Sequence, residues 1–249
     1  MRTRDQWNCW LIFLVLAGLP LLGGCEMKVV GGTARDYFGY TAEYDLAKAA
    51  EKGRVNEVTK LVKGGANVNA VGKKNMTPLM WAFAANNIDG MRALLEVGAD
   101  PNQKFGPEKN IHPVWMAATM DTPDRLKVLL QFNGDPNARG NGAYFNALMQ
   151  GVEHIENVKL LVQAGADVNV TDSVGGTVAL TAVHLAQFDV VIYLLEHGYR
   201  YNLPSLAWSV KNLQLREDIE PKRQKALAVL RELGVTPSPG KAPPMLEEK

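Results

Sequence analysis

The stretch from residue 77 to residue 102 decides the fold, because it contains both signals of a repeated helix pair. It opens with Thr77-Pro78-Leu79-Met80-Trp81-Ala82 and closes with Gly98-Ala99-Asp100-Pro101-Asn102. Threonine caps a helix start, proline fits the first helical turn, and glycine ends a helix in the left-handed conformation. Just before the closing phrase, three apolar residues are spaced as one helix face: Met91, Leu94 and Leu95. The stretch therefore predicts two helices followed by a tight turn.

The closing phrase recurs along the chain at a nearly fixed interval. Its copies are residues 65–69, 98–102, 134–137, 165–169 and a worn copy, 198–202. The asparagines that end them, Asn69, Asn102, Asn137, Asn169 and Asn202, are separated by 33, 35, 32 and 33 residues. A fixed period of this size is typical of a solenoid, in which each unit stacks on the next.

The other signals recur in register with the closing phrase. Degraded opening phrases occupy residues 112–117 and 177–182, each beginning 25 residues before a closing asparagine. Residue types that tolerate positive φ stand two residues before the opening phrases, at Asn75, Asn110, Gly142 and Gly175. An apolar stripe precedes every closing glycine: Val58, Leu61, Val62; Met91, Leu94, Leu95; Leu126, Leu129, Leu130; Val158, Leu161, Val162; Val191, Leu194, Leu195. Loop, helix, helix and glycine stop are thus predicted to repeat in order.

This pattern resembles the ankyrin repeat family, whose unit is a β-turn and two antiparallel helices with a T-P-L-H-x-A start. The resemblance implies an all-α ankyrin repeat solenoid of about five helix-pair repeats over residues 43–202. At the family's histidine position this chain has Met80, Trp115 or Leu180. The histidine's usual hydrogen bond to the neighbouring turn is therefore expected to be missing.

The ends of the repeat array depart from the pattern. The first unit starts at residues 44–49 without a preceding turn, and the fourth, near residues 147–168, is one residue short. Residues 203–236 are expected to form an irregular C-terminal helical cap that closes the core. The proline-rich run that follows predicts a disordered tail over residues 237–249.

The N-terminal residues resemble the signal of a bacterial lipoprotein. A basic start is followed by an apolar run from Trp10 to Leu22, which is too short to span a bilayer. The next residues, Leu22-Gly23-Gly24-Cys25, resemble the lipobox. That resemblance implies that signal peptide 1–24 is cleaved, and that Cys25 is lipidated on its sulfur and acylated on its new amine. The alternative is an ordinary cleaved signal with a chance cysteine.

The lipoprotein resemblance also implies a location. Glu26, rather than the aspartate that favours inner-membrane retention in that family, follows the cysteine. We therefore expect an outer-membrane lipid anchor and a protein that faces the periplasm. Residues 25–42 are expected to be a lipidated tether, because they contain several glycines and no helical period. Fully stretched, this tether would reach about 50 Å from the bilayer.

Composition and motifs exclude several classes of function. The chain has 27 Lys and Arg and 26 Asp and Glu, and loss of the signal peptide leaves 25 of each, so no basic excess favours nucleic acid. Cleavage also removes Cys9, which leaves no cysteine pair for a disulfide or a zinc site. No serine-hydrolase elbow or phosphate loop is present, and the four histidines have no metal-site spacing. The sequence thus indicates a binding protein with no cofactor and no small-molecule substrate, rather than an enzyme.

Ankyrin stacks bind proteins through their turn tips and the first helix of each pair. The resemblance therefore implies a protein-binding surface with these residues: Lys73, Lys74, Trp81, Phe105, Met116, Met120, Arg139, Tyr144 and His184. Aromatic, methionine and arginine side chains are the usual anchors of such an interface. The tip from Gln103 to Ile111 is two residues longer than the tip at 70–76, which predicts that Phe105 projects. The alternative for Trp81 and Trp115 is packing between repeats; we expect exposure for Trp81 and packing for Trp115.

A membrane-tethered, protein-gripping array in the periplasm suits an immunity protein that neutralises a toxin effector. A phospholipase delivered by type VI secretion is an example, because the tether places the protein beside the lipid that such a toxin attacks. The alternative is a lipoprotein that scaffolds resident envelope proteins or supports stress resistance.

Overall fold

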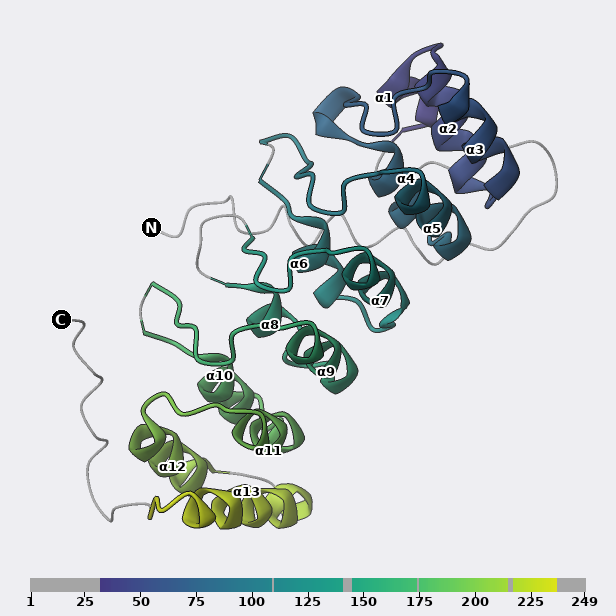
Figure 1. Ribbon diagram of the computed structural model, residues 1–249. Helices are drawn as coiled ribbons and strands as arrows, with labels where there is room; N and C mark the ends of the chain where they lie inside the picture. Colours follow the sequence, from purple (N-terminus) through teal and green to yellow (C-terminus); the bar gives the residue numbers. More distant parts are fainter. Residues whose placement is uncertain (1–31, 109, 141–144, 174, 215–216, 237–249) are drawn as a thin grey trace. The chain divides into compact units, whose positions relative to one another are not determined.

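The computed structural model describes residues 32–108, 110–140, 145–173, 175–214 and 217–236, and within these ranges the fold is all-α (Figure 1). Short helices follow one another in antiparallel pairs, as the sequence predicts. The pairs are α2 (Ala42–Glu51) with α3 (Val55–Lys63), α4 (Pro78–Ala84) with α5 (Ile88–Glu96), α6 (Pro113–Ala118) with α7 (Asp124–Gln131), α8 (Ala147–Gln150) with α9 (Ile155–Gln163), α10 (Val178–His184) with α11 (Phe188–Glu196), and α12 (Leu203–Asn212) with α13 (Glu220–Glu232). Helix α1 (Ala34–Phe38) precedes the first pair, and two 3-10 turns, η3 (Lys73–Asn75) and η4 (Glu217–Ile219), lie in loops. The predicted all-α repeat solenoid is confirmed.

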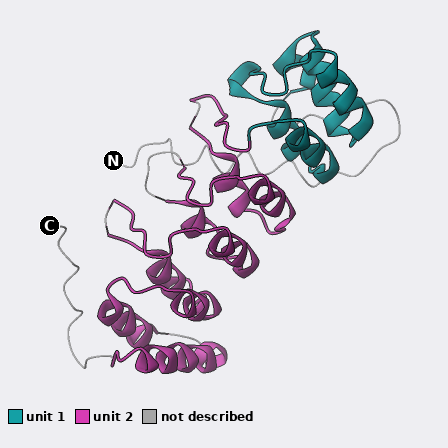
Figure 2. Cartoon of the chain, viewed as in Figure 1, with its two compact units in different colours: residues 1–100 teal, residues 101–249 magenta. Residues whose placement is uncertain are grey.

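The chain forms two compact units, residues 1–100 and residues 101–249 (Figure 2). In unit 1, α2 packs against α4 and α3 against α5. In unit 2, the first helices of the pairs pack in the order α6, α8, α10, α12, and the second helices in the order α7, α9, α11, α13. This stacking fully buries the first residue of each predicted apolar stripe: Val58, Met91, Leu126, Val158 and Val191.

Side chains cap the helix starts where the sequence places them. The hydroxyl oxygen of Thr77 accepts a hydrogen bond from the N–H of Met80 (3.1 Å), and that of Thr177 accepts one from Leu180 (3.2 Å). Asn146 does the same for Met149 in the short fourth repeat (2.8 Å), a cap that the opening phrase did not reveal. These bonds satisfy N–H groups that have no partner inside the helix.

The glycine stops are left-handed at four of the five predicted positions, with φ between 93° and 98° at Gly65, Gly98, Gly165 and Gly198. The third repeat differs, because there Asn133 takes the positive φ of 64° instead of Gly134. A Cβ at Gly134 would lie 2.8 Å from the Leu129 carbonyl oxygen. A glycine is therefore required at position 134 because the backbone of Leu129 lies close to it, and not because of a positive φ.

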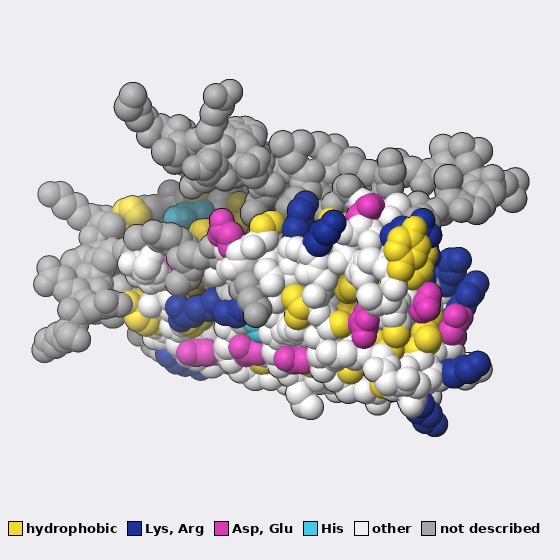
Figure 3. Space-filling model, turned by 90° about the horizontal axis from the view of Figure 1, so that it is seen from above, with side chains coloured by type: hydrophobic (Ala, Val, Ile, Leu, Met, Phe, Trp, Pro, Cys, Tyr) yellow, Lys and Arg dark blue, Asp and Glu magenta, His cyan; other side chains and the backbone are white. Residues whose placement is uncertain are grey.

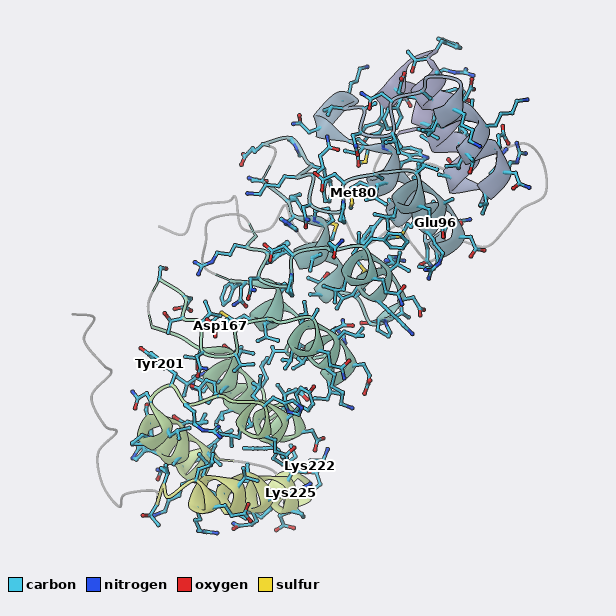
Figure 4. The ribbon with its side chains drawn as sticks, viewed as in Figure 1. Met80, Glu96, Asp167, Tyr201, Lys222 and Lys225 are labelled. Carbon is cyan, nitrogen blue, oxygen red and sulfur yellow. The ribbon has the colours of Figure 1, made fainter. Side chains whose placement is uncertain are left out.

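Four of the five closing asparagines link their turn to the next one, and the fifth, Asn202, caps α12 by accepting from the N–H of Ser205. The Nδ2 of Asn69 donates to the Gly98 carbonyl (3.0 Å), while its Oδ1 accepts from the N–H of Asp100 (2.8 Å). Asn102, Asn137 and Asn169 make the same two bonds to their own next turns in unit 2. Two of the residues joined in this way, Asp167 and Tyr201, are labelled in Figure 4. The period of the sequence is therefore also the spacing of a hydrogen-bonded ladder between repeats.

We expect Asn169→Ala to lower the free energy of unfolding by about 2 kcal/mol. The substitution removes one bond to the Gly198 carbonyl and two from the N–H groups of Arg200 and Tyr201, each with a modest net value in an exposed setting. Urea denaturation followed by circular dichroism measures the change. Asn56→Ala, at an exposed position on α3, is the control and is expected to stay within about 0.5 kcal/mol of the parent. If the two variants lost equal amounts of unfolding free energy, the hydrogen-bonded ladder would not contribute to stability.

Tyr199 fills the core of the worn repeat, where the other copies have alanine or no residue. It is 1% exposed, and its hydroxyl is 3.0 Å from that of Thr177. Burial raises the pKa of Tyr199 to about 12, although the hydrogen bond to Thr177 acts in the opposite direction. The phenol therefore links the last closing phrase to the helix cap of the preceding opening phrase.

This buried phenol predicts a specific loss of stability in alkali. Its folded-state pKa lies above the unfolded value of about 10, so its contribution is complete below pH 10 and is lost as the pH rises to about 12. We expect the parent protein to lose on the order of 2 kcal/mol more than Tyr199→Phe over that interval. Urea denaturation at a series of alkaline pH values tests this, and parallel curves for the two proteins would contradict it.

Residues 34–38 correct the predicted tether. Thr33 and Asp36 form a capping box, in which the Asp36 carboxylate accepts hydrogen bonds from the Thr33 N–H (2.7 Å) and hydroxyl (2.9 Å), and α1 follows. Tyr37 and Phe38 are buried on this helix. A helix of five residues is too short to show an apolar period, which is why the sequence pattern missed it. The tether prediction is wrong for these residues; residues 25–31 of the tether, signal peptide 1–24 and tail 237–249 lie outside the described residues.

The last helix pair joins the stack through α13. Pro221 lies in its first turn, and the Lys222 ammonium forms an ion pair with Asp189 on α11 (Figure 4 labels Lys222). Arg223 donates to the carbonyls of Lys211 and Leu213 at the end of α12. These contacts fasten α13 to both of its neighbours and support its expected role as a cap.

Candidate protein-interaction surface

The first helices of the pairs in unit 2 leave one face uncovered. On α6, Val114 and Ala117 are fully buried, whereas Met116 and the following Met120 are half-buried. On α10, Ala179 and Ala182 are fully buried, whereas His184 and the adjoining Leu185 are exposed. Between them, α8 presents Gln150, with exposed Glu153 just beyond its end. We call these six residues the inner-helix strip: Met116, Met120, Gln150, Glu153, His184 and Leu185.

The short length of these helices sets the position of the strip. One buried stripe on α6 and α10 holds the helix against its neighbours, so the opposite stripe must face away from the core. Because α8 packs against both α6 and α10, the three outward stripes follow one another. The predicted site residues Met116, Met120 and His184 therefore belong to one surface.

A buried arginine contacts one methionine of the strip. The Arg125 guanidinium donates to the Met120 sulfur, with Nη1 to Sδ at 3.1 Å. Arg125 is itself buried, and this burial lowers its pKa, although nearby Asp124 acts in the opposite direction. A second link crosses between repeats, where His154 Nε2 lies 3.7 Å from Asp121 Oδ1. The strip thus combines two methionines, of which Met120 is held by Arg125, with a polar border, as protein interfaces do.

Phe145 is an exposed aromatic residue that the sequence analysis missed. Its side chain is 47% exposed, and its carbonyl oxygen accepts a hydrogen bond from the Trp115 indole N–H (3.1 Å). The Trp115 ring also lies close to Gly140, where an added Cβ would be 2.2 Å from the ring. Trp115 therefore packs against the tip that carries exposed Arg139, as expected. Asn146 could have pointed to Phe145, because an asparagine that caps a helix places the preceding residue in the loop just before the helix begins.

Two predicted site residues are buried, which corrects the expectation for both. Trp81 is 0% exposed; the rings of Tyr37 and Phe38 cover it at centroid distances of 5.5 and 6.3 Å. Phe105 is 7% exposed, because its backbone pairs with Ile111 and the long tip folds into a hairpin. Neither ring is available to a partner.

The remaining predicted tip residues differ in their setting. Lys73 and Lys74 are exposed on the turn of unit 1. Tyr144 lies outside the described residues. The structure therefore brings together the strip residues of unit 2, while the two lysines lie in unit 1.

The charged side chains of the described residues do not follow the pattern of a metal site, nor, on the face seen in Figure 3, that of a one-sign surface. Within the described ranges, no group of three His, Cys, Asp or Glu side chains is placed to hold a metal ion. His197 stacks on Tyr193 with ring centroids 3.8 Å apart, which is a structural role. Cationic and anionic side chains are interspersed over the face seen in Figure 3, without a broad area of one sign. No helix in the described part is both long enough and apolar enough to cross a bilayer.

Stacked helix pairs with one open inner face define an all-helical repeat protein of the kind that binds other proteins. The family model for ankyrin repeats (three copies) matches residues 20–105 and 110–205. The chain therefore belongs to the ankyrin repeat family, which indicates a protein–protein interaction module and no catalytic family. A search of curated proteins finds no match.

Proposed function

We propose that this protein captures a partner protein on the inner-helix strip of unit 2. The observation that carries the proposal is the strip itself. Met116 and Met120 are half-buried at its α6 end and Leu185 is exposed at its α10 end, with the polar side chains of the α8 repeat between them. Methionine adapts its shape to a partner, and a strip of apolar side chains with polar neighbours can be desolvated at modest cost. The inner helix of unit 1 offers no such strip around Trp81, because α1 covers it.

We further propose that the partner is a toxin effector and that this chain is its immunity protein. A lipid on Cys25 would hold it at the outer membrane, facing the periplasm, where a phospholipase delivered by type VI secretion attacks. The lipobox-like residues 22–25, the ankyrin fold and the open strip support this assignment. No cofactor or small-molecule substrate is part of the proposal.

Competition between siblings tests the immunity role. A deletion strain should be killed by effector-positive siblings, and the intact gene should restore survival. Normal survival of the deletion strain would overturn the immunity proposal. Affinity capture from crosslinked envelopes tests the partner: a secreted effector as the main catch supports immunity, whereas resident envelope machinery would replace it with the scaffolding role.

Matched variants test the strip. Leu185→Asp places a charge on the strip, and Val55→Asp does the same at a similarly exposed position on α3, since the two side chains are 45% and 40% exposed. An interface anchor is typically worth 2 kcal/mol or more, so we expect Leu185→Asp to weaken effector binding by about 30-fold. Val55→Asp should bind as the parent does. Equal binding by both variants would remove the strip from the proposal.

The lipid anchor has its own test. Metabolic labelling with palmitate should mark the parent protein and leave Cys25→Ser unlabelled. Labelling of both proteins, or of neither, would overturn lipidation at Cys25 without touching the strip.

A further inference from the structure

We propose that unit 1 docks on the headgroups of an anionic phospholipid bilayer through a surface next to its first helix. We call this surface the α1-turn patch; it consists of Arg35, Tyr40, Val71, Lys73 and Lys74. The proposal deepens the proposed function, since its distance argument rests on a lipid at Cys25. It assigns to the patch a ligand other than the partner protein of unit 2.

The patch presents apolar and cationic groups together. Tyr40 is 81% exposed and Val71 is 51% exposed, although both are side chains that favour burial. The guanidinium of Arg35 lies 4.6 Å from the centre of the Tyr40 ring. Tyrosine and cationic side chains are the residues that collect at the boundary between lipid and water.

Helix α1 and the turn at residues 72–76 form one surface. Gly72 passes so close to α1 that an added Cβ would lie 2.6 Å from the Tyr37 carbonyl oxygen. Hydrogen bonds from the backbone and side chain of Thr33 lower the pKa of Asp36, and the charge of Lys73 adds to the effect. With Asp36 ionised, its charge and those of Arg35, Lys73 and Lys74 leave the surface positive.

The backbone of the turn does not explain a lysine at position 74. Lys74 and Asn75 have φ of 55° and 54°, so the turn needs two left-handed residues in succession. Asparagine and glycine suit such positions, and most other side chains are strained there. Among the described residues, neither Lys73 nor Lys74 has a carboxylate within ion-pair distance. Both ammonium groups are therefore available to an external anion.

The position of α1 limits how far unit 1 can lie from the bilayer. Gly32, the first residue that the structure describes, is buried, and Thr33 caps α1. Six residues separate Gly32 from Cys25, and the seven Cα-to-Cα steps span at most about 25 Å, half the reach expected of the longer tether. A lipid on Cys25 would hold the patch within reach of the headgroups, where each lysine contributes about fivefold to membrane partitioning.

Vesicle sedimentation tests the patch without depending on the lipid anchor. The probe is the chain from residue 25 with Cys25→Ser, mixed with vesicles of phosphatidylglycerol and phosphatidylethanolamine or of phosphatidylcholine alone. We expect binding to the anionic vesicles that falls about 25-fold in Lys73→Gln/Lys74→Gln and falls also in Tyr40→Ser. Lys60→Gln/Lys63→Gln, which removes two exposed lysines from α3, is the matched control and should bind as the parent does.

Three outcomes would overturn the proposal: no binding to anionic vesicles, equal binding to neutral vesicles, or equal losses in the two double variants. A fourth is loss of effector capture, with unchanged vesicle binding, in Lys73→Gln/Lys74→Gln; that result would make the patch a protein-binding surface. The probe carries no lipid, so the vesicle results do not depend on lipidation of Cys25. The palmitate experiment can therefore fail while the patch is still tested. Matching circular dichroism spectra and urea midpoints exclude unfolding as the cause of any loss.

Discussion

Trp81→Ala is expected to lower the free energy of unfolding by about 3–5 kcal/mol, the range seen when a large buried aromatic residue is truncated. The side chain is fully buried between α1 and the body of unit 1, with Tyr37 and Phe38 against its ring. Its indole N–H also donates to the Glu51 carboxylate (2.7 Å), which is held by Lys48 (3.0 Å). The substitution therefore opens a cavity and removes a hydrogen bond from a buried carboxylate.

Urea denaturation measures the loss, and Trp81→Phe separates its two causes. Phenylalanine keeps most of the apolar contact but cannot donate to Glu51, so this variant should lose clearly less than the alanine variant. Burial of Trp81 would be contradicted if the free energy of unfolding of Trp81→Ala stayed within 1 kcal/mol of the parent value while binding of a partner fell. That result would instead support the prediction from the sequence that Trp81 lies on the interaction surface.

Gly90→Ala is expected to destabilise the protein by about 3 kcal/mol, although alanine favours a helix over glycine by about 1 kcal/mol. Gly90 lies within α5, where propensity alone predicts a gain. An added Cβ would lie 1.9 Å from the Ala50 carbonyl oxygen at the end of α2, and this contact is with backbone rather than with a mobile side chain. Relief of the clash requires the two helices to move apart.

The neighbouring Asp89→Ala serves as the control for this prediction. Asp89 is exposed on the same helix turn, so its replacement should change the free energy of unfolding by well under 1 kcal/mol. Denaturation of both variants under the same conditions gives the comparison. A more stable Gly90→Ala would show that α2 and α5 do not approach as closely as the structure has them.

The repeat unit could be predicted because its signals are local. Thr77 caps the helix that begins one residue later, and Gly98 ends the helix two residues before it. Asn69 and its equivalents recur at the spacing of the ladder that they form. Each of these residues acts within one repeat or on the next, so a pattern of about 33 residues contains all the partners involved.

The candidate site was predicted only in part, because exposure depends on segments that the pattern does not place. Met116, Met120 and His184 lie on an open face, whereas Trp81, at the equivalent kind of position, does not. The difference is α1, five residues that show no apolar period and yet supply two aromatic rings. Phe105 was misjudged for a similar reason, since loop length does not reveal that its backbone pairs with Ile111.

The sequence by itself determined the repeat, its order and its helix ends, since caps, glycine stops and apolar stripes depend on neighbours a few residues away. Only the tertiary structure decided which side chains remain open. Burial of Trp81 depends on residues 37 and 38, and the position of the turn at residues 72–76 depends on α1, contacts for which no periodic signal exists. Solvent exposure is a property of everything that packs around a side chain, and short-range patterns carry no record of it.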